Sequence, residues 1–111
     1  MKRDFLLAFA CFFVLLGSAD AAIYKGQKEF SKKCAKCHKE KQTFIASHTQ
    51  SEWKIFLDDG GKPLAKLHLD SKKAEKSWNY FKDSRYTKKV RHLKQFLVEY
   101  AKDSGNVPAC N

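Results

Sequence analysis

Apolar residues recur with helical spacing over much of the chain, and no segment alternates convincingly with the two-residue period of a strand. The clearest stripe lies near the C-terminus and comprises Val90, Leu93, Phe96, Leu97, Tyr100 and Ala101. The predicted helices cover residues 24–37, a short segment carrying Trp53, Phe56 and Leu57, residues 71–82 with Ala74, Trp78 and Phe81, and residues 84–102. The pattern therefore predicts an all-α chain of about four helices.

Capping and turn residues divide these helices. Either Thr49 or Ser51 can cap the short second helix, since a side-chain oxygen there can accept from a free backbone N–H of the first turn. The sequence Gly60–Pro63 is typical of a turn, and Gly105 and Pro108 mark the end of the last helix. We expect the turn to separate two parts of one domain.

The N-terminal segment has the three parts of a secretory signal peptide. The residues after the first Met are basic, residues 5–16 form an apolar run, and residues 17–22 are mostly small. The run is too short to span a bilayer, which takes about 20 residues. We expect a signal peptide over residues 1–21, cleavage after Ala21, export to the periplasm and one mature domain over residues 22–111. An uncleaved amphipathic anchor is the alternative.

The charge balance narrows the class of partner. The 111 residues include 22 Lys and Arg against 12 Asp and Glu, which gives a formal net charge of +10. Such a balance in the cytoplasm would favour nucleic acid, but an exported chain rarely meets any. We therefore expect acidic proteins or an anionic membrane as targets, and no nucleic acid.

The pentapeptide Cys34–His38, with the order Cys-Ala-Lys-Cys-His, has the spacing of a c-type haem attachment site. Two thiols separated by two residues can add across the two vinyl groups of haem. The residue that follows, His38, can offer its imidazole to the iron as proximal ligand. The motif predicts one covalently bound haem c.

Three other interpretations of the cysteines remain open. A thioredoxin-like redox pair would need a strand before the motif, structural zinc would need four ligands, and in an oxidising compartment Cys34 and Cys37 could form a disulfide. Cys11 lies in the apolar run and should leave with the signal peptide. Cys110 could be a free thiol, an intermolecular disulfide or a tether.

A covalently held porphyrin would also help so short a chain to fold. Small domains bury a small share of their surface and often need a staple. We expect the polypeptide to be largely unfolded without haem.

Residues 24–111 resemble a small monohaem class I cytochrome c. The resemblance rests on Gly26 and Phe30 before the haem motif and on the sequence Leu97–Tyr100 in the last helix, while residues 41–83 are similar only loosely. It implies a fold of about four helices around one haem. It also implies that the terminal helices cross, with Gly26 and Phe30 against Leu97 and Tyr100.

The sixth iron ligand departs from that family, which usually supplies a methionine. Met1 is the one methionine and belongs to the signal peptide. We favour His68 as distal ligand, because it follows the Gly-Gly turn where the family places its distal loop. His48 is the second candidate, and His92 is expected to face solvent. A lysine, Asn79 or an open site remain alternatives.

The sequence thus predicts a monomeric electron carrier that is not an enzyme, with a potential below that of relatives with a methionine ligand. Expected pocket walls are Trp53, Trp78, Phe81 and Tyr100, and expected docking residues for an acidic redox partner, or for a membrane-bound oxidase or reductase, are Lys32, Lys33, Lys36 and Lys39. An open sixth site would instead give a gas-binding or weakly peroxidatic protein. Without haem, the chain would be a basic exported binding module.

Overall fold

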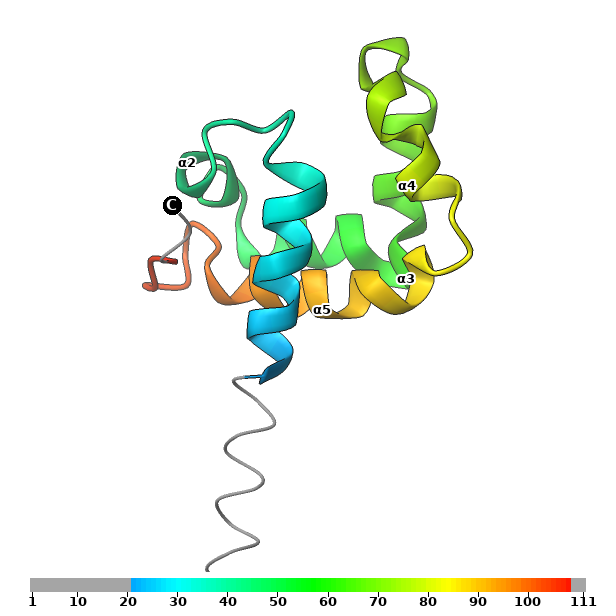
Figure 1. Ribbon diagram of the computed structural model, residues 1–111. Helices are drawn as coiled ribbons and strands as arrows, with labels where there is room; N and C mark the ends of the chain where they lie inside the picture. Colours follow the sequence, from blue (N-terminus) through cyan, green and yellow to red (C-terminus); the bar gives the residue numbers. More distant parts are fainter. Residues whose placement is uncertain (1–20, 109–111) are drawn as a thin grey trace, which may run out of the picture.

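The computed structural model describes residues 21–108, and every regular element in that range is helical (Figure 1). A helix over residues 21–29 continues into the π-helix η1 (Phe30–Cys34), and is followed by α2 (Gln42–Ile45), α3 (Gln50–Leu69), the 3₁₀-helix η2 (Lys72–Ser77), α4 (Trp78–Lys82) and α5 (Tyr86–Glu99). This confirms the all-α prediction for the described part of the chain. Almost all of the predicted signal peptide, together with Cys11 and Cys110, lies outside the described residues. No helix within 21–108 is long and apolar enough to cross a membrane.

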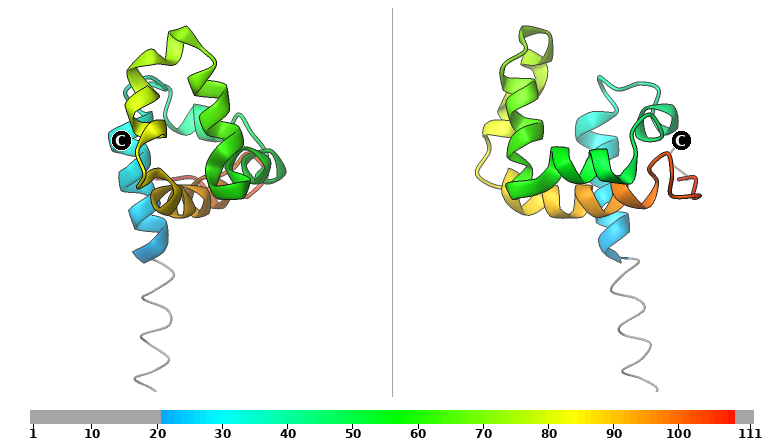
Figure 2. Two further views of the ribbon diagram at one scale, coloured as in Figure 1. Left: turned by 90° about the vertical axis from the view of Figure 1, so that its right-hand side faces the viewer. Right: turned by 180° about the vertical axis from the view of Figure 1, so that it is seen from behind.

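The first helix crosses α5, as Figures 1 and 2 show. Gly26 is the point of closest approach: a Cβ there would overlap the carbonyl oxygen of His92 and lie 2.6 Å from Cβ of Phe96. One turn later, the rings of Phe30 and Phe96 lie 5.8 Å apart. The predicted crossing of the terminal helices is confirmed, but the partners predicted for Gly26 on α5 are wrong. Gly26 meets His92 and Phe96 instead of Leu97 and Tyr100.

Helix α3 consists of two arms joined by a sharp bend. The arm before residue 58 packs along α5, whereas the arm over residues 62–69 turns away from it (Figures 1 and 2). Asp59, Gly60 and Gly61 have φ values of 51°, 64° and 77°, a left-handed conformation that glycine adopts without steric cost. The predicted turn is confirmed. The stretch that contains His68 is helical, however, where a loop was expected.

The bend is anchored on α5 at Gly61. The hydroxyl of Tyr86 donates to the Gly61 carbonyl at 2.6 Å. A Cβ on Gly61 would lie 2.6 Å from Cγ2 of Val90, so the close approach itself requires glycine. This contact fixes where the second arm of α3 leaves the layer formed by α5 and the first arm.

The buried apolar residues join four segments: the first helix, α2, the first arm of α3 and α5. They are Phe30, Ile45, Trp53, Leu57, Tyr86, Val90, Leu93, Phe96, Leu97 and Ala101. The indole N–H of Trp53 donates to the carbonyl of Ile45 at 2.9 Å, which satisfies a buried donor. The stripe predicted for the last helix is therefore its buried face, except that Tyr100 is half-buried.

Helix boundaries differ from the predictions in detail. Thr49, and not Ser51, is the N-cap of α3, and Thr49 and Glu52 form a reciprocal capping box. The third predicted helix is a 3₁₀ segment, η2, followed by the short α4. The last helix begins at Tyr86 and ends at Glu99, inside the predicted range. The four-residue helix α2 was not predicted.

Candidate functional site

Cys34 ends the first helix, and the chain then turns tightly through the rest of the haem motif. The backbone N–H groups of Cys37 and His38 both donate to the carbonyl of Cys34, at 3.2 and 2.9 Å. The preceding segment, η1, is a π-helix, a widened turn that occurs frequently at functional sites. One turn of backbone thus presents two thiols and one imidazole. Both thiols are free in the structure.

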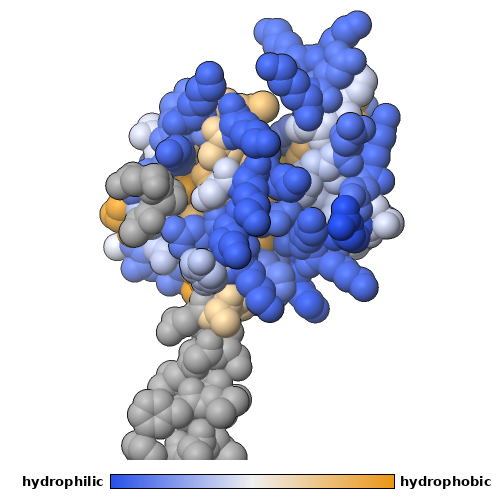
Figure 3. Space-filling model, viewed as in Figure 1, coloured by the Kyte–Doolittle hydropathy of each residue, from blue (hydrophilic) through white to orange (hydrophobic). Residues whose placement is uncertain are grey.

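A cavity lies between this turn and the segments that follow the bend of α3. Its volume is about 210 Å³, below the range of about 300–1,000 Å³ usual for ligand sites, and the cavity is partly open to solvent. It is lined by Phe30, Lys33, Cys34, Cys37, His38, Phe44, Trp53, Leu64, His68, Ser71, Lys73, Ala74, Ser77, Tyr80, Phe81, Leu93 and Leu97. Figure 3 shows apolar residues between the hydrophilic residues that cover most of this face of the molecule. All four predicted site residues therefore share one largely apolar cavity.

The imidazoles of His38 and His68 lie close to each other in this cavity. Their ring centroids are 6.2 Å apart and their planes are inclined by 81°. Each ring packs against a phenyl ring: His38 stacks on Phe44 at 3.8 Å, and His68 stacks on Phe81 at 4.3 Å. These contacts hold both imidazoles at the cavity wall.

One hydrogen bond defines the tautomer of His68. Its Nδ1 lies 2.8 Å from the carbonyl oxygen of Leu64 on the same helix. A carbonyl only accepts, so Nδ1 must carry a proton, and Nε2 is the nitrogen through which the neutral ring could bind a metal. A hydrogen bond from the other ring nitrogen to a carbonyl usually orients a metal-binding histidine in this way.

Burial and the neighbouring His68 together lower the pKa of His38. A lowered pKa favours the neutral imidazole, which is the form that binds a metal. The opposing influence of Glu40 is smaller.

The donor set fits a haem iron. Two imidazoles that bind one metal ion have ring centres up to about 6 Å apart, because each metal–nitrogen bond is about 2 Å and each ring centre lies about 1 Å beyond its nitrogen. The separation of His38 and His68 agrees with this value. Cys34 and Cys37 line the same cavity, as covalent attachment of the macrocycle requires.

The Cys34 thiol is poorly suited to redox exchange. Burial raises its pKa to about 12, and the nearby Glu29 and Cys37 act in the same direction. Thiol–disulfide exchange needs the thiolate, which a reactive cysteine obtains through a lowered pKa. The environment of Cys34 therefore does not favour the thioredoxin-like interpretation.

The other two histidines do not line the cavity. His48 lies 3.2 Å from a carboxylate oxygen of Glu52 and packs against Trp53 and Phe56. His92 lies beneath the helix crossing at Gly26 and is half-buried, so the expectation that it faces solvent is wrong. Of the described histidines, His38 and His68 are the two at the cavity.

The predicted pocket walls are half right. Trp53 and Phe81 line the cavity, whereas Trp78 and Tyr100 do not. The indole N–H of Trp78 instead donates to the His68 carbonyl at 2.7 Å and so holds the end of α3. Tyr100 packs on Phe96, 5.3 Å between centroids.

Sequence reasoning missed several walls of the cavity. Phe44 lies on the unpredicted α2, whose four residues give no periodic pattern. Leu64 could have been found, because it precedes His68 by one helical turn.

No group of three or more His, Cys, Asp or Glu side chains within residues 21–108 is arranged to hold a metal ion. No protein-family model, curated protein or solved structure matches this chain.

Proposed function

We propose that this protein is a periplasmic c-type cytochrome that carries single electrons between redox proteins through one haem bound by two histidines. The observation that carries the proposal is the pair His38 and His68, 6.2 Å apart in a cavity that also contains both thiols of the haem motif. Haem, when bound, supplies a one-electron couple at its iron.

Each part of the site has a role in this proposal. Cys34 and Cys37 would hold the macrocycle, and His38 and His68 would bind the iron. The phenyl rings of Phe44 and Phe81 keep the imidazoles in place. An iron bound by two imidazoles would suit electron transfer. Without a methionine sulfur, the reduction potential should lie below that of relatives with His/Met ligation.

The lysines around the haem motif form the proposed docking face for an acidic redox partner. Lys32, Lys33, Lys36 and Lys39 are all exposed beside the two cysteines. Such a face steers association by long-range attraction, which salt screens. Reversing the charge of all four should slow reduction by a physiological donor, more at low than at moderate ionic strength. Unchanged rates at both would remove the docking role. A membrane-bound oxidase or reductase with an acidic surface fits the same face.

An optical spectrum tests the proposal directly. The full chain is produced with a c-type haem maturation system, purified, and measured oxidised, reduced, and reduced with carbon monoxide. Sharp α and β bands that carbon monoxide leaves unchanged are expected. A high-spin spectrum that shifts with the gas would instead favour the gas-binding or peroxidatic alternative. A colourless protein would overturn haem attachment.

A further inference from the structure

A second hollow lies next to the cavity that contains Cys34, Cys37, His38 and His68, which we call the haem-motif cavity. This second hollow is lined mainly by cations. Its volume is about 260 Å³. Three segments meet there: the end of the first helix, the region of η2 and α4, and the start of α5. The cations that line it are Lys32, Lys33, Lys36, Lys76, Arg85 and Lys89. We call this hollow the cationic cleft.

The positive charge of the cleft is almost uncompensated. Asp83 is the one carboxylate among its described lining residues. Arg85 donates two hydrogen bonds to this carboxylate, from Nε at 3.1 Å and from an Nη nitrogen at 2.8 Å. Within residues 21–108, none of the five lysines of the cleft forms an ion pair.

Several lysines around one hollow favour a ligand that carries several negative charges on a compact group. Each lysine offers three N–H donors on a flexible stem, so five of them can surround a compact anion. The cleft also contains the neutral side chains of Ser77 and Asn79 and the rings of Tyr80 and Tyr86. The hydroxyl of Tyr80 is buried and lies close to the carboxylate of Glu29.

We propose that the cationic cleft binds a small, multiply charged oxyanion of the phosphate type. The cleft is concave and of limited volume, and side chains from three segments line it. Such a site fits a compact ligand with several acceptor oxygens. Charge-assisted hydrogen bonds from ammonium groups are the strong contacts that such an anion makes. The anion would be bound by none of the proposed iron ligands or attachment cysteines, although Lys33, Ser77 and Tyr80 line both cavities.

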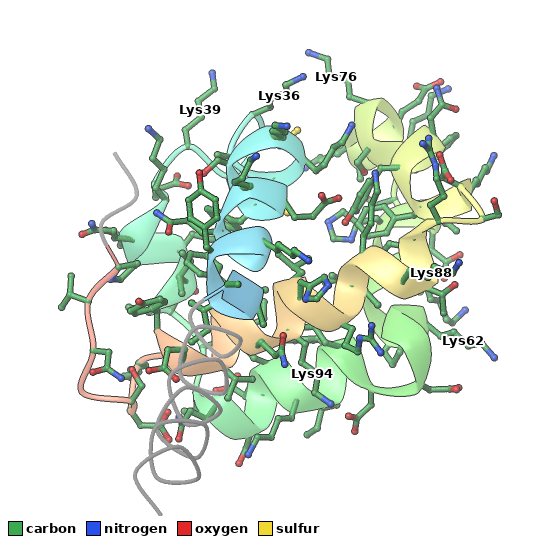
Figure 4. All side chains as sticks on the ribbon, turned by 60° about the horizontal axis from the view of Figure 1, so that its bottom comes forward. Lys36, Lys39, Lys62, Lys76, Lys88 and Lys94 are labelled. Carbon is green, nitrogen blue, oxygen red and sulfur yellow. The ribbon has the colours of Figure 1, made fainter. Side chains whose placement is uncertain are left out.

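The variant Lys36→Gln/Lys76→Gln tests the site, because its two lysines reach the cleft from different segments. Figure 4 shows both side chains extending from the same side of the molecule. The matched control is Lys62→Gln/Lys88→Gln, which removes the same charge from exposed lysines that do not line the cleft. Circular dichroism should confirm that both variants keep the helical content of the parent protein.

Calorimetric titration with inorganic phosphate and with pyrophosphate is the primary measurement, on the purified full chain at low ionic strength. We expect saturable binding with one site, tighter for pyrophosphate. The cleft variant should bind at least about tenfold more weakly, since it loses charge-assisted hydrogen bonds from two lysines. The control variant should stay within about twofold of the parent.

A second arm separates a free anion from a lipid headgroup, which carries the same phosphate chemistry. Sedimentation with vesicles containing phosphatidylglycerol should show binding that both double variants weaken equally, as general charge attraction predicts. Vesicle binding lost in the cleft variant alone, with no phosphate binding in solution, would overturn the free-anion proposal. The free-anion proposal would also be overturned if neither phosphate nor pyrophosphate bound the parent protein. The same holds if phosphate bound the cleft variant as tightly as the parent.

Discussion

The imidazole rings of His38 and His68 lie 6.2 Å apart although they belong to different parts of the fold. His38 follows the first helix, and His68 lies in the last turn of α3. They come together because α3 bends at Gly60 and Gly61, which brings its second arm to the haem-motif cavity. The bend therefore brings the two histidines together, and their spacing in the sequence does not.

Replacing His68 by alanine should open one side of the proposed iron site. We expect His68→Ala to lose the low-spin spectrum of the reduced form and to bind carbon monoxide without denaturant. His48→Ala is the control and should retain the spectrum of the parent, because His48 lies outside the cavity. An unchanged spectrum in His68→Ala, with an altered one in His48→Ala, would assign the distal ligand to His48.

Gly26→Ala should weaken the helix crossing. The new Cβ would overlap the His92 carbonyl, which is backbone and cannot rotate away. We expect the free energy of unfolding to fall by about 1–3 kcal/mol, the usual cost of overpacking. Chemical denaturation measures it. Lys25→Ala, an exposed neighbour on the same helix, should change it by less than about 0.5 kcal/mol. Equal stability of the two variants would show that the helices do not cross at Gly26.

Thr49→Ala should destabilise the first arm of α3. Its hydroxyl oxygen accepts from the backbone N–H of Glu52 at 3.2 Å, and a Glu52 carboxylate oxygen accepts from the Thr49 N–H at 3.1 Å. Losing such a cap costs about 1 kcal/mol, measured as a lower midpoint of denaturation. Ser51→Ala is the matched control and should be nearly neutral. A larger effect at Ser51 would place the cap there.

The pair of Asp83 and Arg85 should make stability depend on pH. Hydrogen bonds from the guanidinium and the backbone N–H of Arg85 lower the pKa of Asp83. A lowered pKa contributes stability above the ordinary value of about 4 and loses it as the pH falls further. Asp83→Asn should therefore have a lower melting temperature than the parent protein at pH 7.

That difference should shrink steadily as the pH is lowered from 5 toward 2. Arg85→Gln removes the other partner and should also lower the melting temperature at pH 7. If Asp83→Asn melts with the parent at pH 7, the pair contributes no stability.

Local patterns in the sequence already determine several features. The motif Cys34–His38 predicts two thiols and one imidazole close together, because these residues are neighbours in the sequence. The apolar stripe of α5 predicts its buried face, since helical periodicity alone sets which residues point the same way. A glycine at residue 26 suggested the close crossing, and Thr49 was one of two caps that the sequence allowed.

Tertiary packing decided what those patterns left open. Which histidine reaches the cavity depends on the angle at which α3 bends, and that angle is fixed by the contact of Gly61 with Tyr86. Gly26 lies against His92 and Phe96 and not against the predicted residues, because the fit between the two helix surfaces sets where they cross. The cationic cleft is likewise tertiary, because its lysines gather only where three segments meet.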